Sequence, residues 1–200
     1  MRQNAKDILI NKAISLFNAG QIKQCLKESL RVRKKFPEEP FIYNLLGVLY
    51  AHNESYEDSI KNYSKALKLN PNYIEVYNNI GVAYTSWKKI NKAIEFFDKA
   101  IKINPSYAEA YNNKGNALKE KGEYQRAAEC YKESINLDPN FTDAITNLGI
   151  IWDLMNDFIK SERYFRQALT QDPTNTSTLY NLANCLFNAR QYNKTIEVCE

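Results

Sequence analysis

Five of the six prolines, at positions 37, 71, 105, 139 and 173, stand 34 residues apart. Between them the same order of apolar, small and aromatic residues returns in phase. A fixed period of about 20 to 50 residues indicates a repeat array, in which each repeat packs only on its neighbours. We therefore predict a single array over residues 6–200, built from the repeats 6–39, 40–73, 74–107, 108–141 and 142–175 and a partial repeat 176–200.

Each repeat is predicted to form two helices, and we number positions from its first residue. In the third repeat, apolar Tyr77, Ile80 and Tyr84 occupy positions 4, 7 and 11, the i, i+3, i+7 spacing of one helix face. We name this segment helix A. Small Ala93 at position 20 and large Phe97 at position 24 lie in helix B. Helix B ends before the proline at position 32, because proline disrupts helical hydrogen bonding.

The loop between helix B and the next helix A carries good capping residues at position 33. They are Asn72, Ser106, Asn140 and Thr174. We expect them to be N-caps of helix A, with Ser106 and Glu109 forming a capping box. The turn from helix A to helix B falls at position 15, where two repeats have Gly20 and Gly122.

Glycine recurs inside helix A, at position 8. The four glycines are Gly47, Gly81, Gly115 and Gly149. Glycine within a helix costs about 1 kcal/mol relative to alanine. Its recurrence predicts that helices A and B approach closely where position 8 meets the small residue at position 20.

The full pattern is a small residue at position 8, an aromatic residue or leucine at 11, alanine at 20 and 27, an aromatic residue at 24 and proline at 32. It resembles the tetratricopeptide repeat (TPR) across residues 6–200. The resemblance implies an all-α fold, a right-handed α-solenoid of stacked antiparallel helix pairs. It also implies a concave groove lined by helix A. The first repeat departs most, with Lys12 at position 7 and Ser29 at 24, and Lys114 at position 7 is also atypical.

Asparagine occupies position 6 of helix A in five of the six repeats, on the face that the resemblance assigns to the groove. A side-chain amide donates and accepts hydrogen bonds, so such a row can bind a peptide backbone without reading its side chains. The predicted groove residues are Asn11, Asn44, Asn78, Asn79, Asn112, Asn113, Asn116, Asn147, Asn181, Asn184 and Lys119. Inheritance by repeat duplication explains the row equally well. Similar asparagine rows line the TPR arrays of O-linked N-acetylglucosamine transferases.

Several function classes are disfavoured by composition. The net charge of +4 is not clustered on one basic face, so nucleic-acid binding is not expected. No apolar run approaches the ~20 residues of a membrane span. The single histidine, His52, and four dispersed cysteines give neither a catalytic constellation nor a metal-ligand spacing. We expect a cytoplasmic protein that is not an enzyme and uses no cofactor or metal.

The sequence therefore predicts a non-catalytic scaffold that binds an extended peptide or protein segment. The alternative is the substrate-recruiting arm of a larger enzyme, such as a glycosyltransferase, whose catalytic domain lies outside this chain. Acidic Glu75, Glu109 and Asp143 at position 2 disfavour the clamp that binds carboxylate-rich chaperone tails. The sequence stops inside helix B of the sixth repeat, which predicts a longer polypeptide or self-association through the uncapped C-terminal helix.

Overall fold

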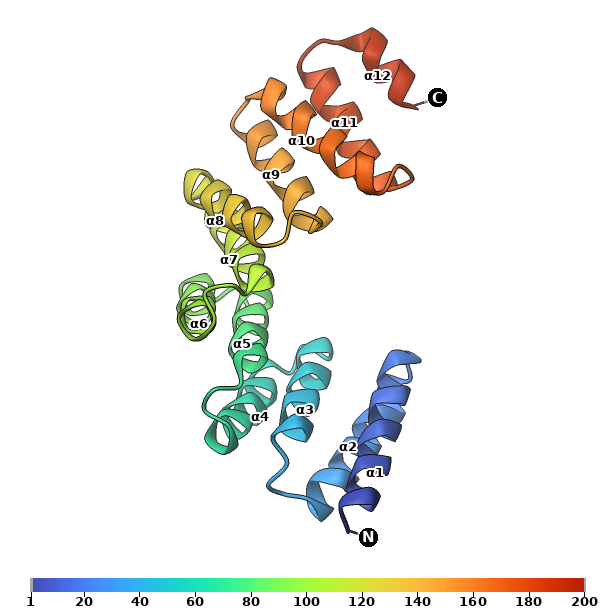
Figure 1. The fold of residues 1–200 in the computed structure, drawn as a ribbon, viewed down its shortest axis with the longest axis vertical. Coiled ribbons are helices and arrows are strands. Elements are labelled where there is room, and N and C mark those ends of the chain that lie inside the picture. The colour runs from blue at the N-terminus through green and yellow to red at the C-terminus, as the bar shows by residue number, and fades with distance from the viewer. Residues whose placement is uncertain (1, 200) are drawn as a thin grey trace. The chain divides into compact units, whose positions relative to one another are not determined.

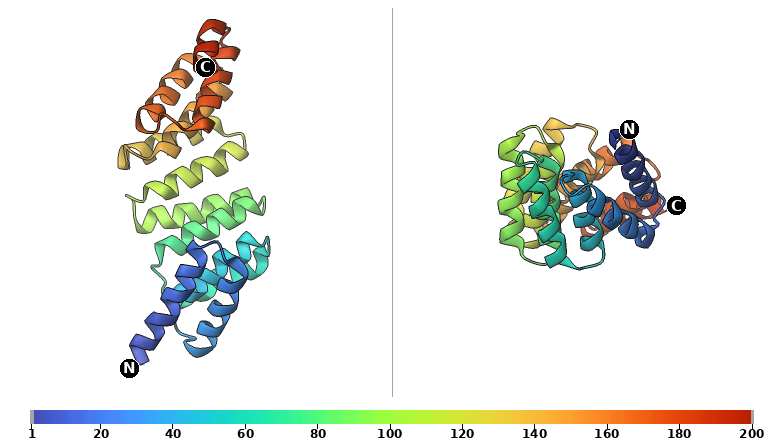
Figure 2. Two further views of the ribbon diagram at one scale, coloured as in Figure 1. Left: turned by 90° about the vertical axis from the view of Figure 1, so that its right-hand side faces the viewer. Right: turned by 90° about the horizontal axis from the view of Figure 1, so that it is seen from below.

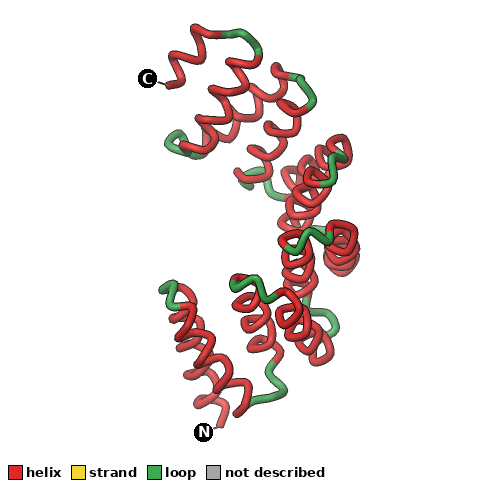
Figure 3. Tube along the Cα trace, turned by 180° about the vertical axis from the view of Figure 1, so that it is seen from behind, coloured by secondary structure: helices red, strands yellow, loops and turns green. Residues whose placement is uncertain are grey.

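The computed structural model describes residues 2–199, with side chains from residue 5 onward. These residues form helices joined by short loops (Figure 1), and no strand occurs among them (Figure 3). The helices are α1 (Arg2–Asn18), α2 (Ile22–Lys35), α3 (Pro40–His52), α4 (Tyr56–Leu69), α5 (Ile74–Ser86), α6 (Ile90–Ile103), α7 (Ala108–Glu120), α8 (Tyr124–Leu137), α9 (Thr142–Leu154), α10 (Phe158–Gln171), α11 (Thr176–Asn188) and α12 (Tyr192–Cys199). The predicted all-α fold is confirmed.

Successive helix pairs follow the predicted repeats, with odd-numbered helices as helix A and even-numbered helices as helix B. Helix α3 begins at Pro40, the first residue of the second repeat, where proline is well tolerated because the first helical N–H has no partner within the helix. Helix α1 differs, because it begins at Arg2 rather than at residue 6. The turn from helix A to helix B falls at position 15, as predicted, and Gly20 and Gly122 adopt the left-handed backbone conformation there.

The chain divides into two compact units, Met1–Phe96 and Phe97–Glu200, which we call the N-terminal and C-terminal units. In the N-terminal unit each helix from α1 to α5 packs on the next. In the C-terminal unit the same holds from α7 to α12, and Figure 2 shows these helices following one another in sequence order. Helix A also touches the next helix A, in the pairs α3–α5, α7–α9 and α9–α11.

Position 8 is small because an aromatic ring from helix B covers it. A Cβ atom added to Gly115 would lie 2.6 Å from the Tyr131 ring, and one added to Gly149 would lie 2.7 Å from the Phe165 ring. The predicted contact with position 20 is also present, since Oγ of Ser59 donates a 2.7 Å hydrogen bond to the carbonyl of Gly47. The ring at position 24 is therefore what excludes a larger side chain.

The predicted N-caps at position 33 are wrong by one residue. The N-caps of α5, α7 and α9 are Tyr73, Tyr107 and Phe141 at position 34, and their side chains make no capping hydrogen bond. The residue at position 33 instead donates its backbone N–H to a side chain two residues earlier, as Ser106 does to Oδ1 of Asn104 at 3.0 Å. Position 33 therefore belongs to an Asx turn before the helix.

Candidate functional site

Two asparagine pairs join helix A of one repeat to helix A of the next. In the N-terminal unit, Nδ2 of Asn79 donates a 3.0 Å hydrogen bond to Oδ1 of Asn44. In the C-terminal unit, Nδ2 of Asn147 donates a 3.1 Å hydrogen bond to Oδ1 of Asn112. In each pair the donor is at position 6 and the acceptor at position 5 of the preceding repeat. The asparagine row therefore holds neighbouring repeats together, a role that the sequence interpretations did not include.

The predicted groove residues differ widely in exposure. At position 5, Asn78 is 1% exposed and Asn112 is 6% exposed. The half-buried residues are Asn44, Asn79, Asn113, Asn116, Asn147, Asn181 and Lys119, and the exposed ones are Asn11 and Asn184. A partner that approaches helix A therefore meets position 6 more readily than position 5.

Two predicted groove residues of α7, Asn116 and Lys119, are affected by packing within the C-terminal unit. The Tyr131 hydroxyl donates a 2.8 Å hydrogen bond to Oδ1 of Asn116, so this oxygen helps to fix helix B against helix A. Partial burial lowers the pKa of the Lys119 ammonium. Lys114, the unusual residue at position 7, places its Nζ 2.6 Å from Oδ1 of Asp98 in α6. The charge of Lys114 is thus paired with a carboxylate.

An open cleft of about 560 Å³ lies in the C-terminal unit, around the N-terminal ends of α7 and α9. It is lined by Tyr107, Ala108, Glu109, Asn112, Asn113, Asp138, Phe141 and Asp143. Two of these, Asn112 and Asn113, are predicted groove residues. Sequence reasoning did not include Asp138 and Phe141, which lie in the loop between α8 and α9 and reach the cleft only when the repeats stack.

Three carboxylates give the cleft a negative charge. Glu109 lies in the first turn of α7 and Asp143 in the first turn of α9. Asp138 is the C-cap residue that follows α8. The Tyr107 hydroxyl donates a 3.1 Å hydrogen bond to Oε2 of Glu109, and Oδ1 of Asp138 accepts one from the backbone N–H of Asn140 at 3.0 Å. Among the described residues that line the cleft, none is a lysine or an arginine.

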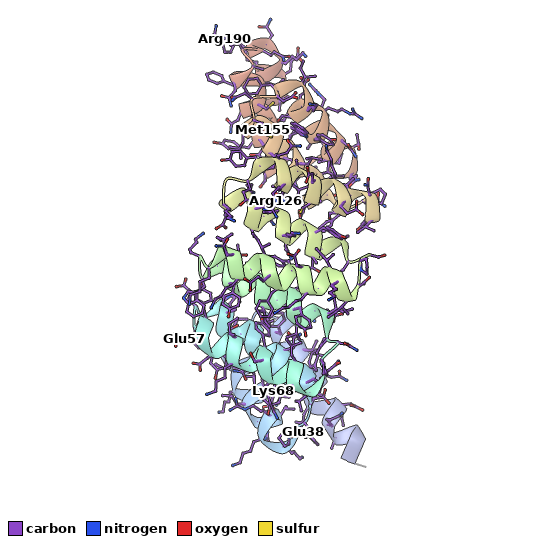
Figure 4. The ribbon with its side chains drawn as sticks, turned by 90° about the vertical axis from the view of Figure 1, so that its left-hand side faces the viewer. Glu38, Glu57, Lys68, Arg126, Met155 and Arg190 are labelled. Carbon is purple, nitrogen blue, oxygen red and sulfur yellow. The ribbon has the colours of Figure 1, made fainter. Side chains whose placement is uncertain are left out.

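The helix dipole accounts for part of this acidity, because carboxylates are favoured at helix N-termini and cations at C-termini. Helix α4 shows the same arrangement, with Glu57 in its first turn and Lys68 in its last (Figure 4). The dipole does not account for Asp138, which follows a helix. Asp138 has a local role of its own, because its Oδ1 accepts the Asx-turn hydrogen bond from the backbone N–H of Asn140.

The described residues contain no cluster of histidine, cysteine and acidic side chains that could hold a metal ion. The three carboxylates that line the cleft therefore do not form such a cluster. No helix in the described part of the chain is long and apolar enough to cross a membrane.

Family models for the tetratricopeptide repeat match residues 74–107, 108–141 and 164–197, and a TPR repeat model matches residues 49–86. Together these matches cover more than half of the chain. Among curated proteins, no sequence matches this one significantly.

Solved structures show the same fold. PilF of Pseudomonas aeruginosa is 16% identical, with a TM-score of 0.83 over 97% of this chain and 88% of that one. The type IV pilus biogenesis factor PilW is 20% identical, with a TM-score of 0.84 over 96% of this chain and 90% of that one. YrrB, described as a TPR protein with an unusual peptide-binding site, is 19% identical, with a TM-score of 0.64 over 86% of this chain and 89% of that one. At these identities the likeness concerns the fold alone.

Proposed function

This chain belongs to the tetratricopeptide repeat family, and we propose that it is a protein-interaction scaffold that binds an extended peptide segment against helix A. One observation carries the proposal. The cleft of about 560 Å³ in the C-terminal unit is lined by Asn112 and Asn113, two asparagines of the predicted row. An extended segment has unpaired backbone N–H and C=O groups, and side-chain amides can satisfy both.

Two further observations support this class of partner. Asn11 and Asn184 are exposed on helices α1 and α11, so polar side chains of helix A are accessible in both units. YrrB, which shares the fold, is described as having a peptide-binding site. None of the three solved structures reported above is described as a glycosyltransferase, the alternative that the sequence left open.

Site-specific photo-crosslinking tests the proposal. A photoreactive phenylalanine is placed singly at two exposed helix A positions of the C-terminal unit, Asp143 in α9 and Asn184 in α11. Matched controls carry it at exposed helix B positions of the same unit, Glu129 in α8 and Arg163 in α10. Partners captured from cells of the source organism are then mapped by mass spectrometry to the cross-linked residues.

The proposal predicts that the helix A probes capture the same partner, through one contiguous segment, and that the helix B probes capture it much less. The cross-linked residues of the partner should be contiguous in its sequence, because an extended peptide contacts successive repeats in order. Equal capture by the helix B probes would contradict binding against helix A. Capture through residues scattered over a folded domain would contradict an extended segment.

A further inference from the structure

Helix B carries the same basic face in the first two repeats. Positions 22, 26 and 29 lie on one side of the helix, because their spacing is i, i+4 and i+7. In α2 and α4 every one of these positions is basic: Lys27, Arg31, Lys34, Lys61, Lys65 and Lys68. The third repeat keeps two of the three cations, and in α8 the same positions are Glu129, Glu133 and Asn136. The basic face is therefore a property of the first repeats and not of the repeat pattern.

The net charge of the chain arises in the same region. Residues 1–39 contain nine lysines and arginines against four aspartates and glutamates, whereas residues 40–200 contain 18 against 19. The expectation that positive charge is not clustered on one face is thus wrong for the N-terminal unit. The cations of the face are three or four residues apart in the sequence, and only the helix brings them together.

An open cleft of about 610 Å³ lies between α2 and α4. Four cations line it, Arg33 from α2 and Lys61, Lys65 and Lys68 from α4, against a single carboxylate, that of Asp58 (Lys68 is labelled in Figure 4). The cleft is thus positively charged, and charge complementarity specifies an anionic ligand.

The four cations of the cleft form no ion pair with any described residue. Other cations of the same unit do form such pairs. Nζ of Lys6 lies 2.7 Å from Oε2 of Glu39. Lys12 and Arg31 lie 3.5 Å and 3.7 Å from Oε1 of Glu28. The cleft between α2 and α4 is therefore where the basic charge of the unit is left without a carboxylate.

Two of these cations are partly removed from water. Arg33 and Lys65 are half-buried, and Nζ of Lys65 lies 5.9 Å from the centre of the Tyr43 ring. Partial burial of a charge is unfavourable unless an opposite charge compensates it. An anion that enters the cleft supplies that charge, so Arg33 and Lys65 gain more from it than fully exposed cations do.

The surroundings of the cleft favour an acidic protein segment over other polyanions. Separate carboxylates on flexible stems reach the half-buried Arg33 and Lys65 more readily than a flat lipid surface does. A single nucleic-acid strand stacks its bases on exposed rings, but Tyr43 is only 9% exposed and its hydroxyl donates a hydrogen bond to the carbonyl of Pro37. Asp58 repels a continuous phosphate backbone, whereas a peptide can place an uncharged residue beside it.

The spacing of the lysines suits an extended peptide. Helix α4 rises about 10 Å from Lys61 to Lys68, and alternate residues of an extended chain are about 7 Å apart on the same side. Two or three carboxylates at alternate positions therefore span the row.

We propose that the cleft between α2 and α4 binds an acidic segment of a partner protein, whose carboxylates pair with Arg33, Lys61, Lys65 and Lys68. This surface belongs to helix B of the N-terminal unit. It is separate from the helix A surface of the proposed function and gives the scaffold a second binding site.

Nuclear magnetic resonance titration of the full chain tests the inference with defined probes. The probes are the acetylated and amidated heptapeptide Ser-Glu-Ser-Glu-Ser-Glu-Ser, its glutamine counterpart and a single-stranded oligothymidine of equal net charge. We expect the glutamate peptide to shift the backbone amides of Arg33, Lys61, Lys65 and Lys68 saturably. Its binding should weaken as salt is raised, because partly exposed ion pairs are screened. The glutamine peptide should bind about tenfold more weakly or less.

Two triple variants test the role of the charges. Lys61→Gln/Lys65→Gln/Lys68→Gln removes three cations and should lower affinity for the glutamate peptide about tenfold. It should still fold, because glutamine is as good a helix former as lysine. Lys61→Arg/Lys65→Arg/Lys68→Arg keeps the charges and should bind within about threefold of wild type. Equal loss in both variants would show that the charge of the face is not what binds.

A third variant, Lys102→Gln/Lys132→Gln/Arg163→Gln, controls for the change in net charge, because it removes three exposed cations from other helices B. Like Lys68 in α4, Lys102 lies in the last turn of its helix, so both sets lose a similar helix-dipole interaction. We expect this control to bind the glutamate peptide as wild type does. A loss as large as that of the glutamine variant of α4 would overturn the inference.

Other outcomes would also overturn it. These are equal binding of the glutamate and glutamine peptides, shifts confined to residues outside the cleft, and the absence of any saturable shift. Tighter binding of the oligothymidine would assign the face to nucleic acid. Stronger co-sedimentation with vesicles of phosphatidylserine and phosphatidylcholine than the peptide affinity explains would assign it to a membrane. The photo-crosslinking probes lie in the C-terminal unit, so a failure here is distinguishable from a failure of the proposed function.

Discussion

Asn147 and Asn112 lie 35 residues apart, and a 3.1 Å hydrogen bond joins Nδ2 of the first to Oδ1 of the second. The bond connects α9 to α7, the helices A of neighbouring repeats. Asn79 and Asn44 make the equivalent bond in the N-terminal unit at 3.0 Å. Because the amide of position 6 is engaged in this way, replacing it should affect the stability of the array as well as binding.

We predict that Asn147→Ala lowers the free energy of unfolding by about 1–2 kcal/mol, since it leaves Oδ1 of buried Asn112 without its donor. Urea denaturation followed by circular dichroism measures the change. Asn11→Ala is the control, because Asn11 is exposed and its replacement should change stability by less than about 0.5 kcal/mol. A double-mutant cycle with Asn112→Leu should give a coupling energy of about 0.5–1.5 kcal/mol, and additive effects would contradict the bond.

Gly115→Ala should destabilise the protein by about 1–3 kcal/mol, because the new methyl group would lie 2.6 Å from the Tyr131 ring. Helix propensity alone predicts the opposite, a gain of about 1 kcal/mol. The sign of the change in melting temperature therefore separates packing from propensity. Asn184→Ala, at an exposed position of helix α11, is the control and should be neutral or slightly stabilising. A higher melting temperature for Gly115→Ala would contradict the packing.

Asp153 in α9 should make stability depend on pH. Burial raises the pKa of its carboxyl, and Oδ1 has no hydrogen-bond partner among the described residues. A raised folded-state pKa means that the native state binds the proton more tightly than the unfolded state. Stability therefore falls as pH rises from the ordinary aspartate pKa, near 4, through the folded-state value.

Asp153→Asn removes this titration, so the variant should be more stable than wild type at neutral pH, by a few tenths of a kcal/mol given partial exposure. The advantage should vanish below about pH 4, where the wild-type carboxyl is protonated. Urea denaturation at neutral pH and below about pH 4 measures the difference in the free energy of unfolding between the variant and wild type. Glu129→Gln, at an exposed position of α8, controls for the loss of one negative charge. An advantage that persisted at low pH would show that the effect is unrelated to the carboxylate.

The repeat boundaries and the fold could be predicted from the sequence because they depend on local patterns that recur. Proline at position 32 ends helix B, and the spacing of Tyr77, Ile80 and Tyr84 defines one face of helix A. The prediction of the N-caps at position 33 was wrong by one residue, also for a local reason. Asn104 competes for the backbone N–H of Ser106, so the helix starts one residue later than the capping pattern indicated.

The candidate site was only partly predictable. The position of Asn112 on helix A follows from periodicity, but its bond to Asn147 links two repeats and depends on how their helices stack. The cleft is also lined by Phe141, which occupies position 34, where an earlier repeat has Tyr73. A comparison of position 34 between repeats would have shown that change. It could not have shown that Phe141 lines a cleft together with Asn112.

The most direct test is to measure the side-chain amide resonance of Asn112 while the segment identified by photo-crosslinking is titrated into the full chain. If that segment binds against helix A, the Asn112 resonance should shift saturably, with the same dissociation constant as the backbone amides of Glu109 and Asp143. Saturation of the protein by the segment with the Asn112, Glu109 and Asp143 resonances unchanged would contradict the account.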